Sequence, residues 1–208
     1  MAKATNTGTC ELCGHITSKG TMSRHLAACA PAHDAPGEPE PLIHLRFESP
    51  DDKRYWIHVE ARAATTLEQV DSLLRRVWLE CCGHLSAFRL GRLEIGKGRK
   101  VGELLALGPA KFLHEYDFGS TTVLAGQVLG LREGSLGRRA VRVTARNDPF
   151  VWPCDECGAA ATLVCPFCLY DGTGLLCETH AESHEHAREE VYLPVVNSPR
   201  MGVCGYTG

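Results

Sequence analysis

The pattern of apolar and polar residues between residues 42 and 148 predicts a compact domain that mixes strands and helices. Leu42–Phe47 and Tyr55–Val59 alternate as strands do, and Pro50–Lys53 supplies a turn between them. Apolar residues then repeat at helical spacing from Leu67 to about Cys81. We expect this helix to cover the sheet.

The boundaries of this helix and of the later elements follow from local signals. Thr65 and Glu68 predict a capping box at the start of the helix. The further elements are a strand at Ala87–Ile95, a short helix at Val101–Leu107, an antiparallel pair at Phe112–Phe118 and Thr121–Leu131, and a closing strand at Val141–Ala145.

The rest of the chain divides around this domain. Residues 31–41 are rich in proline and small or acidic residues, which is typical of a flexible linker. We therefore expect four parts: a metal-binding module at 1–30, the linker at 31–41, the mixed domain at 42–148 and a second metal-binding module at 149–208. Apolar residues in Val191–Gly208 predict a strand that packs back.

Composition bears on compartment and partners. The chain has 208 residues, a net charge of −3 and eleven cysteines, and no apolar run approaches the length of a membrane span. Cysteines grouped with histidines, with no apolar leader before them, predict a cytosolic protein in a reducing compartment. Residues 150–208 carry eight acidic and two basic side chains, so that this end should repel a phosphate backbone.

Cysteines and histidines near the C-terminus are spaced as metal ligands. A Cys-x-x-Cys pair lets two thiolates reach one ion, and the set is large enough for two four-coordinate zinc ions. The predicted ligands are Cys154, Cys157, Cys165, Cys168, Cys177, His180, His184 and His186.

This spacing resembles a B-box type zinc module, a class that chiefly makes protein contacts. The resemblance implies interleaved sites, the first pair of cysteines with Cys177 and His180, and the second pair with His184 and His186. The alternative is a ribbon in which the two Cys-x-x-Cys pairs share one ion.

The N-terminal segment carries a second ligand pattern. Cys10, Cys13, His25 and Cys29 have the spacing of a zinc finger in which cysteine replaces the last histidine. We predict a hairpin and then a helix from about Ser18 to Ala28, with Ile16 and Met22 as its small core, and folding that requires the ion. Zinc is thus the expected cofactor, with three ions per chain.

Such a finger suggests nucleic acid as an alternative partner. The positions that would contact DNA are Ser18, Lys19, Thr21 and Arg24, of which Arg24 is the strong guanine reader. One finger reads about three base pairs, which gives little specificity. We therefore favour protein contact over DNA contact.

A motif in the central domain resembles a known family. His84-Leu85, Phe88 and the run Tyr116-Asp117-Phe118-Gly119 resemble the insertion-element passenger family, also called the Ri-plasmid open-reading-frame-three-like family. The resemblance covers about residues 42–146. It implies a bacterial α+β domain with a small, mostly antiparallel sheet and packed helices, here flanked by the two zinc modules. Relatives continue with an acidic residue and a tryptophan, whereas Ser120 follows here.

The sequence nominates no catalytic residues. It lacks a His-Glu-x-x-His motif, a phosphate loop, a dinucleotide fingerprint and a nucleophile elbow. Asp117 suits a turn and His84 a cap, and Cys81, Cys82 and Cys204 suit packed thiols. We thus expect a non-catalytic bacterial adaptor that binds a protein, with no membrane or small-molecule partner; the alternatives are a nucleic-acid-associated factor of mobile elements and an enzyme using Asp117 and His84.

Overall fold

The chain forms two compact units in a computed structural model that describes residues 6–107, 111–189 and 191–208. One unit comprises the described residues up to Arg75 together with Leu85–Asp148. The other joins Arg76–His84 to Pro149–Gly208. The second unit is therefore built from two stretches that lie far apart in the sequence.

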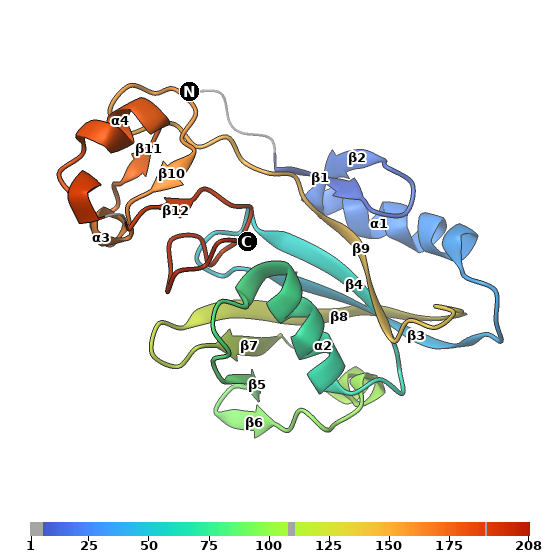
Figure 1. The fold of residues 1–208 in the computed structure, drawn as a ribbon. Helices are drawn as coiled ribbons and strands as arrows, with labels where there is room; N and C mark the ends of the chain where they lie inside the picture. Colours follow the sequence, from blue (N-terminus) through green and yellow to red (C-terminus); the bar gives the residue numbers. More distant parts are fainter. Residues whose placement is uncertain (1–5, 108–110, 190) are drawn as a thin grey trace. The chain divides into compact units, whose positions relative to one another are not determined.

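The first unit is organised around one antiparallel sheet (Figure 1). Among the described residues it has nine strands in the order β2-β1-β9-β4-β3-β8-β7-β5-β6. The strands are β1 (Thr7–Cys10), β2 (Ile16–Ser18), β3 (Glu40–Glu48), β4 (Trp56–Arg62), β5 (Ser86–Leu90), β6 (Leu93–Ile95), β7 (Phe112–Tyr116), β8 (Thr122–Gly134) and β9 (Val141–Asn147). The predicted α+β class is confirmed, but the sheet is large because the finger strands β1 and β2 extend it.

Helices lie beside this sheet and connect its strands. In Figure 1, α2 crosses one face of the sheet, and a hydrogen bond of 2.6 Å between Asp71 on α2 and His114 on β7 joins the two. The helical segments of the first unit are α1 (Lys19–Cys29), η1 (Ala30–His33), α2 (Leu67–Leu74) and η3 (Val101–Leu107). The π-helical η2 (Arg75–Leu79) follows α2, and all of it beyond Arg75 belongs to the second unit.

Two helix boundaries differ from the prediction. The capping box is formed by Thr66 and Gln69, because the hydroxyl of Thr65 is buried and donates to the carbonyl of Ala140 instead. Regular α-helix ends at Leu74 and continues as the π-helical turn η2 rather than as α-helix to Cys81. Tertiary hydrogen bonding therefore moved the cap by one residue.

One predicted strand is in fact a hairpin. Ala87–Ile95 divides into β5 and β6, because Gly91 has a φ of 58°, a left-handed conformation that turns the chain. The predicted pair after it is confirmed, with Tyr116 opposite Thr122 across the β7–β8 turn.

The N-terminal finger shares its core with the sheet. Met22 and Leu26 on α1 pack with Cys10, with Ala145 of β9 and with Trp56 of β4, all of them buried. Ile16 was predicted as finger core but is 61% exposed, because Trp56 fills the space that a free-standing finger would fill from its own hairpin.

Residues of the predicted linker contact the sheet. The Asp34 carboxylate accepts hydrogen bonds from Arg132 at 2.6 and 2.9 Å. The backbone N–H of Ala35 donates to the carbonyl of Ser135, and Arg142 donates to the carbonyl of His33. The segment is thus held at several points between η1 and β3.

The second unit has little regular structure. Its elements are β10 (Leu163–Val164), α3 (Pro166–Leu169), β11 (Leu175–Leu176), α4 (Glu178–Ser183), η4 (Ala187–Glu189) and β12 (Leu193–Pro194), with the strand order β11-β10-β12. The strand predicted in residues 191–208 is limited to β12, which pairs with β10. No helix in the described ranges combines the length and the apolar character needed to span a membrane.

Candidate metal centres

All eleven cysteines of the chain lie in four clusters with histidine. Each cluster offers four ligand atoms that lie within 4.8 Å of one another, a spacing consistent with zinc. The sequence predicts three zinc ions, whereas the described residues form four such clusters. The clusters are Cys10, Cys13, His25 and Cys29; Cys154, Cys157, Cys177 and His180; Cys165, Cys168, His184 and His186; and Cys81, Cys82, His84 and Cys204.

The finger cluster is assembled by the hairpin and α1. Sulfur atoms of Cys10 and Cys29 are 3.9 Å apart, and the Cys13 sulfur is 3.3 Å from Nε2 of His25. Two sulfurs on a tetrahedral zinc ion stand about 3.8 Å apart, given zinc–sulfur bonds of about 2.3 Å. Burial and the adjacent thiols raise the pKa of Cys29 to about 12, so ionisation of this thiol needs a compensating cation.

The second cluster joins the turn that contains Cys154 and Cys157 to the start of α4. Cys177 is the N-cap of α4, and His180 follows one turn later, with Nδ1 3.3 Å from the Cys177 sulfur and 3.7 Å from that of Cys154. Burial acts to raise the pKa of Cys154, but backbone N–H groups of Cys177, Cys157 and Glu156 bring the net value to about 6. The backbone here already favours the thiolate that a metal requires.

The third cluster uses α3 and the chain after α4. Cys165 caps α3, and the sulfur of Cys168 lies 3.3 Å from Nε2 of His184 and 3.5 Å from Nδ1 of His186. The ligands of this and the second cluster alternate along the sequence. The structure therefore has the interleaved arrangement and not the ribbon in which both Cys-x-x-Cys pairs meet.

The fourth cluster was missed by sequence reasoning. The sequence predicts packed side chains at Cys81, Cys82 and Cys204, but Cys82 and Cys204 are exposed. His84 has Nε2 at 3.0 Å from the Cys82 sulfur and 3.2 Å from the Cys204 sulfur. Cys204 follows His84 by 120 residues in the sequence, so no short spacing links it to the other three residues of the cluster.

A dipeptide could have pointed to this cluster. Cys-Gly occurs at residues 13–14, 82–83, 157–158 and 204–205, and each of these glycines has a left-handed φ, between 69° and 82°. At two of them the glycine N–H donates at 2.8 Å to the carbonyl of the cysteine four residues earlier, Cys10 and Cys154. Such a turn directs two thiolates at one point, and only glycine adopts it without strain.

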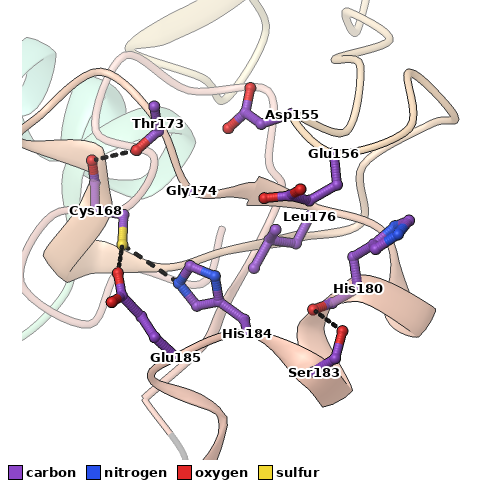
Figure 2. Close-up of a pocket in the computed structure, with 10 residues that line it drawn as sticks. All are labelled: Asp155, Glu156, Cys168, Thr173, Gly174, Leu176, His180, Ser183, His184 and Glu185. Atoms are coloured by element: carbon purple, nitrogen blue, oxygen red, sulfur yellow. Dashed lines mark hydrogen bonds between the residues drawn. The ribbon is translucent and has the colours of Figure 1, made fainter.

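An acidic cavity lies between the two interleaved clusters (Figure 2). It has a volume of about 530 Å³, and the exposed carboxylates of Asp155, Glu156 and Glu185 line it. The ligands Cys168, His180 and His184 also contribute to its wall.

The four positions considered for DNA contact lie at the start of α1. Ser18, Thr21 and Arg24 are exposed. Lys19 forms an ion pair with Glu48 of β3 at 2.5 Å, and the hydroxyl of Thr21 contacts Ser18. Of the two basic residues, Lys19 is therefore engaged in an ion pair, whereas Arg24 is exposed and takes part in none of the ion pairs described for residues 6–107, 111–189 and 191–208.

The segment Tyr116–Gly119, from which a resemblance to the passenger family is predicted, forms a turn. Asp117 has a φ of 64°, and its carboxylate accepts a hydrogen bond of 3.0 Å from the N–H of Gly119, as expected for a turn residue. Tyr116 is buried and Phe118 is 52% exposed. His84, which the sequence predicts as a cap, lies in the fourth cluster.

Comparisons with known proteins give little further guidance. No family model matches the chain, and no curated protein does; membership of the passenger family stays a prediction. A solved structure of a protein of unknown function from Methanosarcina mazei Go1 is similar, with a TM-score of 0.49 and 15% identity over 73% of this chain and 88% of that chain.

Proposed function

We propose that this chain is a non-catalytic bacterial adaptor, stabilised by zinc, whose residues 149–208 bind a protein partner in the cytosol. The observation that carries the proposal is the interleaved pair of clusters. The ions would hold in place a surface whose described hydrophobic cluster is small, with Cys165, Cys168, Leu176 and Ala181 buried in it.

Charge supports a basic partner for this surface. The described acidic side chains of residues 149–208 are all exposed: Asp155, Glu156, Asp171, Glu178, Glu182, Glu185 and Glu189. Three of them line the cavity between the clusters. A lysine or arginine side chain of a partner would complement this cavity, whereas nucleic acid would be repelled.

Exposed apolar side chains supply the second element of an interface. Tyr170 is 84% exposed, Phe167 is 48% exposed and Val151 is 84% exposed. Phe167 and Tyr170 belong to the α3 segment that follows Cys165, so a bound ion would restrict them before a partner arrives. Rigid aromatic anchors of this kind carry much of the energy of protein interfaces.

The donor sets favour structural metal. Each cluster offers four protein ligands, which would fill a tetrahedral zinc ion and leave no open position for a substrate. The use of every cysteine in a cluster also fits a reducing compartment, where thiolates bind metal rather than form disulfides.

The test is affinity purification of the chain from its host, with and without nuclease, for wild type and for a Glu156→Gln/Glu185→Gln variant. Both residues line the cavity and neither is a predicted ligand. We expect a defined protein to be retained by wild type and lost by the variant. A matched control, Glu94→Gln on β6 of the other unit, should retain it.

The alternative is contact with DNA through the finger, and exposed Arg24 is the observation in its favour. A gel shift that is salt-sensitive and abolished by Arg24→Ala would support it. Recovery of nucleic acid alone, or of proteins that nuclease removes, would contradict the adaptor proposal.

A further inference from the structure

We propose that Cys81, Cys82, His84 and Cys204 bind a fourth zinc ion, which fastens the C-terminal segment to residues 76–84 and is the first of the four to be lost. This site shares no residue with the interleaved clusters and does not depend on the adaptor proposal. All of its residues belong to the second unit.

The distances within the cluster suit one tetrahedral ion. The Cys82 sulfur is 3.8 Å from the sulfurs of both Cys81 and Cys204. This equals the separation of about 3.8 Å expected between two thiolates on zinc, and it is far longer than a disulfide bond of about 2.05 Å. None of the three cysteines forms a disulfide.

The glycines that follow Cys82 and Cys204 have the same left-handed backbone conformation as the glycine that follows Cys13 in the finger. Gly83 after Cys82 has a φ of 82° and Gly205 after Cys204 a φ of 69°, compared with 76° for Gly14 in the finger. Cys204 itself has a φ of 51°. A residue with a Cβ atom adopts this conformation at a cost, and a metal–sulfur bond is an interaction that would offset it.

A buried cation adjoins the cluster. Arg200 is 0% exposed, and its guanidinium donates a hydrogen bond of 3.5 Å to the Cys81 sulfur. Three thiolates and one zinc ion carry a net charge of about −1, which complements the guanidinium, and N–H donors to metal-bound sulfur are a common support of such sites.

Hydrogen bonds also connect the C-terminal segment to the residues just before Cys81. The hydroxyl of Ser198 donates to the carbonyl of Trp78 at 2.6 Å and accepts from the N–H of Arg200 at 2.9 Å. Cys204 is the ligand that this segment contributes, so the ion would close a ring between residues 78–84 and 198–204. Losing it would release the segment beyond Ser198.

Exposure explains why this ion would leave first. Each of the other clusters has at least one buried cysteine: Cys10, Cys154, or Cys165 with Cys168. In the fourth, Cys82 and Cys204 are exposed while Cys81 and His84 are half-buried. Among the described clusters it is therefore the one most accessible to a chelator.

The experiment is native mass spectrometry of the zinc-loaded full chain. We expect four zinc ions on wild type and three on Cys204→Ser. The control Val203→Ala should also bind four, because Val203 is next to Cys204 in the sequence but is not part of the cluster. Trypsin should cleave after Arg200 in Cys204→Ser but not in the control. Three ions on wild type, or a disulfide among these cysteines in the purified chain, would overturn the proposal.

A second measurement on wild type does not depend on how the variant folds. The chain is treated with a limiting amount of zinc chelator and then with iodoacetamide, and the modified cysteines are mapped. Cys82 and Cys204 should be alkylated before Cys10, Cys154 and Cys165. Simultaneous modification of all clusters, or earlier modification of Cys154, would contradict the assignment.

Discussion

Single residues set the geometry of the candidate metal centres. The left-handed glycines at 14, 83, 158 and 205 each follow a ligand and aim the thiolates inward. Buried polar residues have equally specific roles elsewhere. In the first unit, the rings of His44 and His58 are joined by a hydrogen bond of 2.8 Å on neighbouring strands β3 and β4.

These two histidines should stay neutral in the folded protein. Burial lowers the pKa of His44 to about 4 and that of His58 to about 2. Unfolded histidine has a pKa of about 6.5, so between about pH 6.5 and pH 4 the unfolded state binds more protons and stability falls as pH falls. NMR titration should leave both rings unprotonated from pH 8 to 5.5; a midpoint near 6.5 for either would contradict their burial.

A glycine in β1 is required by close packing. A Cβ atom at Gly8 would overlap the ring of Trp56 and the carbonyl of Arg146, whereas a Cβ at Gly130 in β8 meets nothing within 4 Å. Gly8→Ala should therefore destabilise the first unit by about 1–3 kcal/mol, and Gly130→Ala should be close to neutral. Denaturant unfolding measures both, and equal stabilities of the two variants would refute this packing.

At the scale of elements, the finger is part of the sheet. β1 pairs with β9, and α1 rests on Trp56 through Met22 and Leu26. An ion pair between Lys19 and Glu48 adds a further link from α1 to β3. The finger thus gains from the sheet some of the burial that an isolated finger lacks.

Loss of the finger ion should unfold the finger without unfolding the rest of the sheet. In His25→Ala, β1, β2 and α1 should lose hydrogen-exchange protection while β3 and β8 keep theirs, because the ion supplies most of the free energy of folding of so small a module. His15→Ala is the control, since His15 stacks on His25 at 4.5 Å but is outside the cluster. Protection of α1 unchanged in His25→Ala would show that the sheet alone folds it.

The elements that the sequence predicted are those with local signals. The β7–β8 hairpin and the helix at 19–29 follow from periodicity and ligand spacing, and the twelve ligands that were predicted fall into three clusters. Tertiary contacts explain the differences. Thr65 bonds to Ala140 and leaves the cap to Thr66, and Trp56 displaces Ile16 from the finger core. Cys204 meets His84 only in the folded chain.

At the scale of the whole molecule, the two units differ in what would stabilise them. The first buries large apolar side chains in its sheet, including Trp56, Phe47, Phe88 and Phe112. The second has a small buried cluster and three of the four Cys/His clusters. We therefore expect zinc removal to affect the second unit far more than the first.

The central claim is that the chain holds four ions in these particular ligand sets, and cadmium-113 NMR of the cadmium-substituted chain tests it most directly. The chemical shift of bound cadmium depends on how many sulfur atoms coordinate it. The structure predicts four resonances, three from sites with three cysteines and one histidine and one from the site with two of each. A resonance from a site with four cysteines, which the ribbon arrangement requires, would contradict the account.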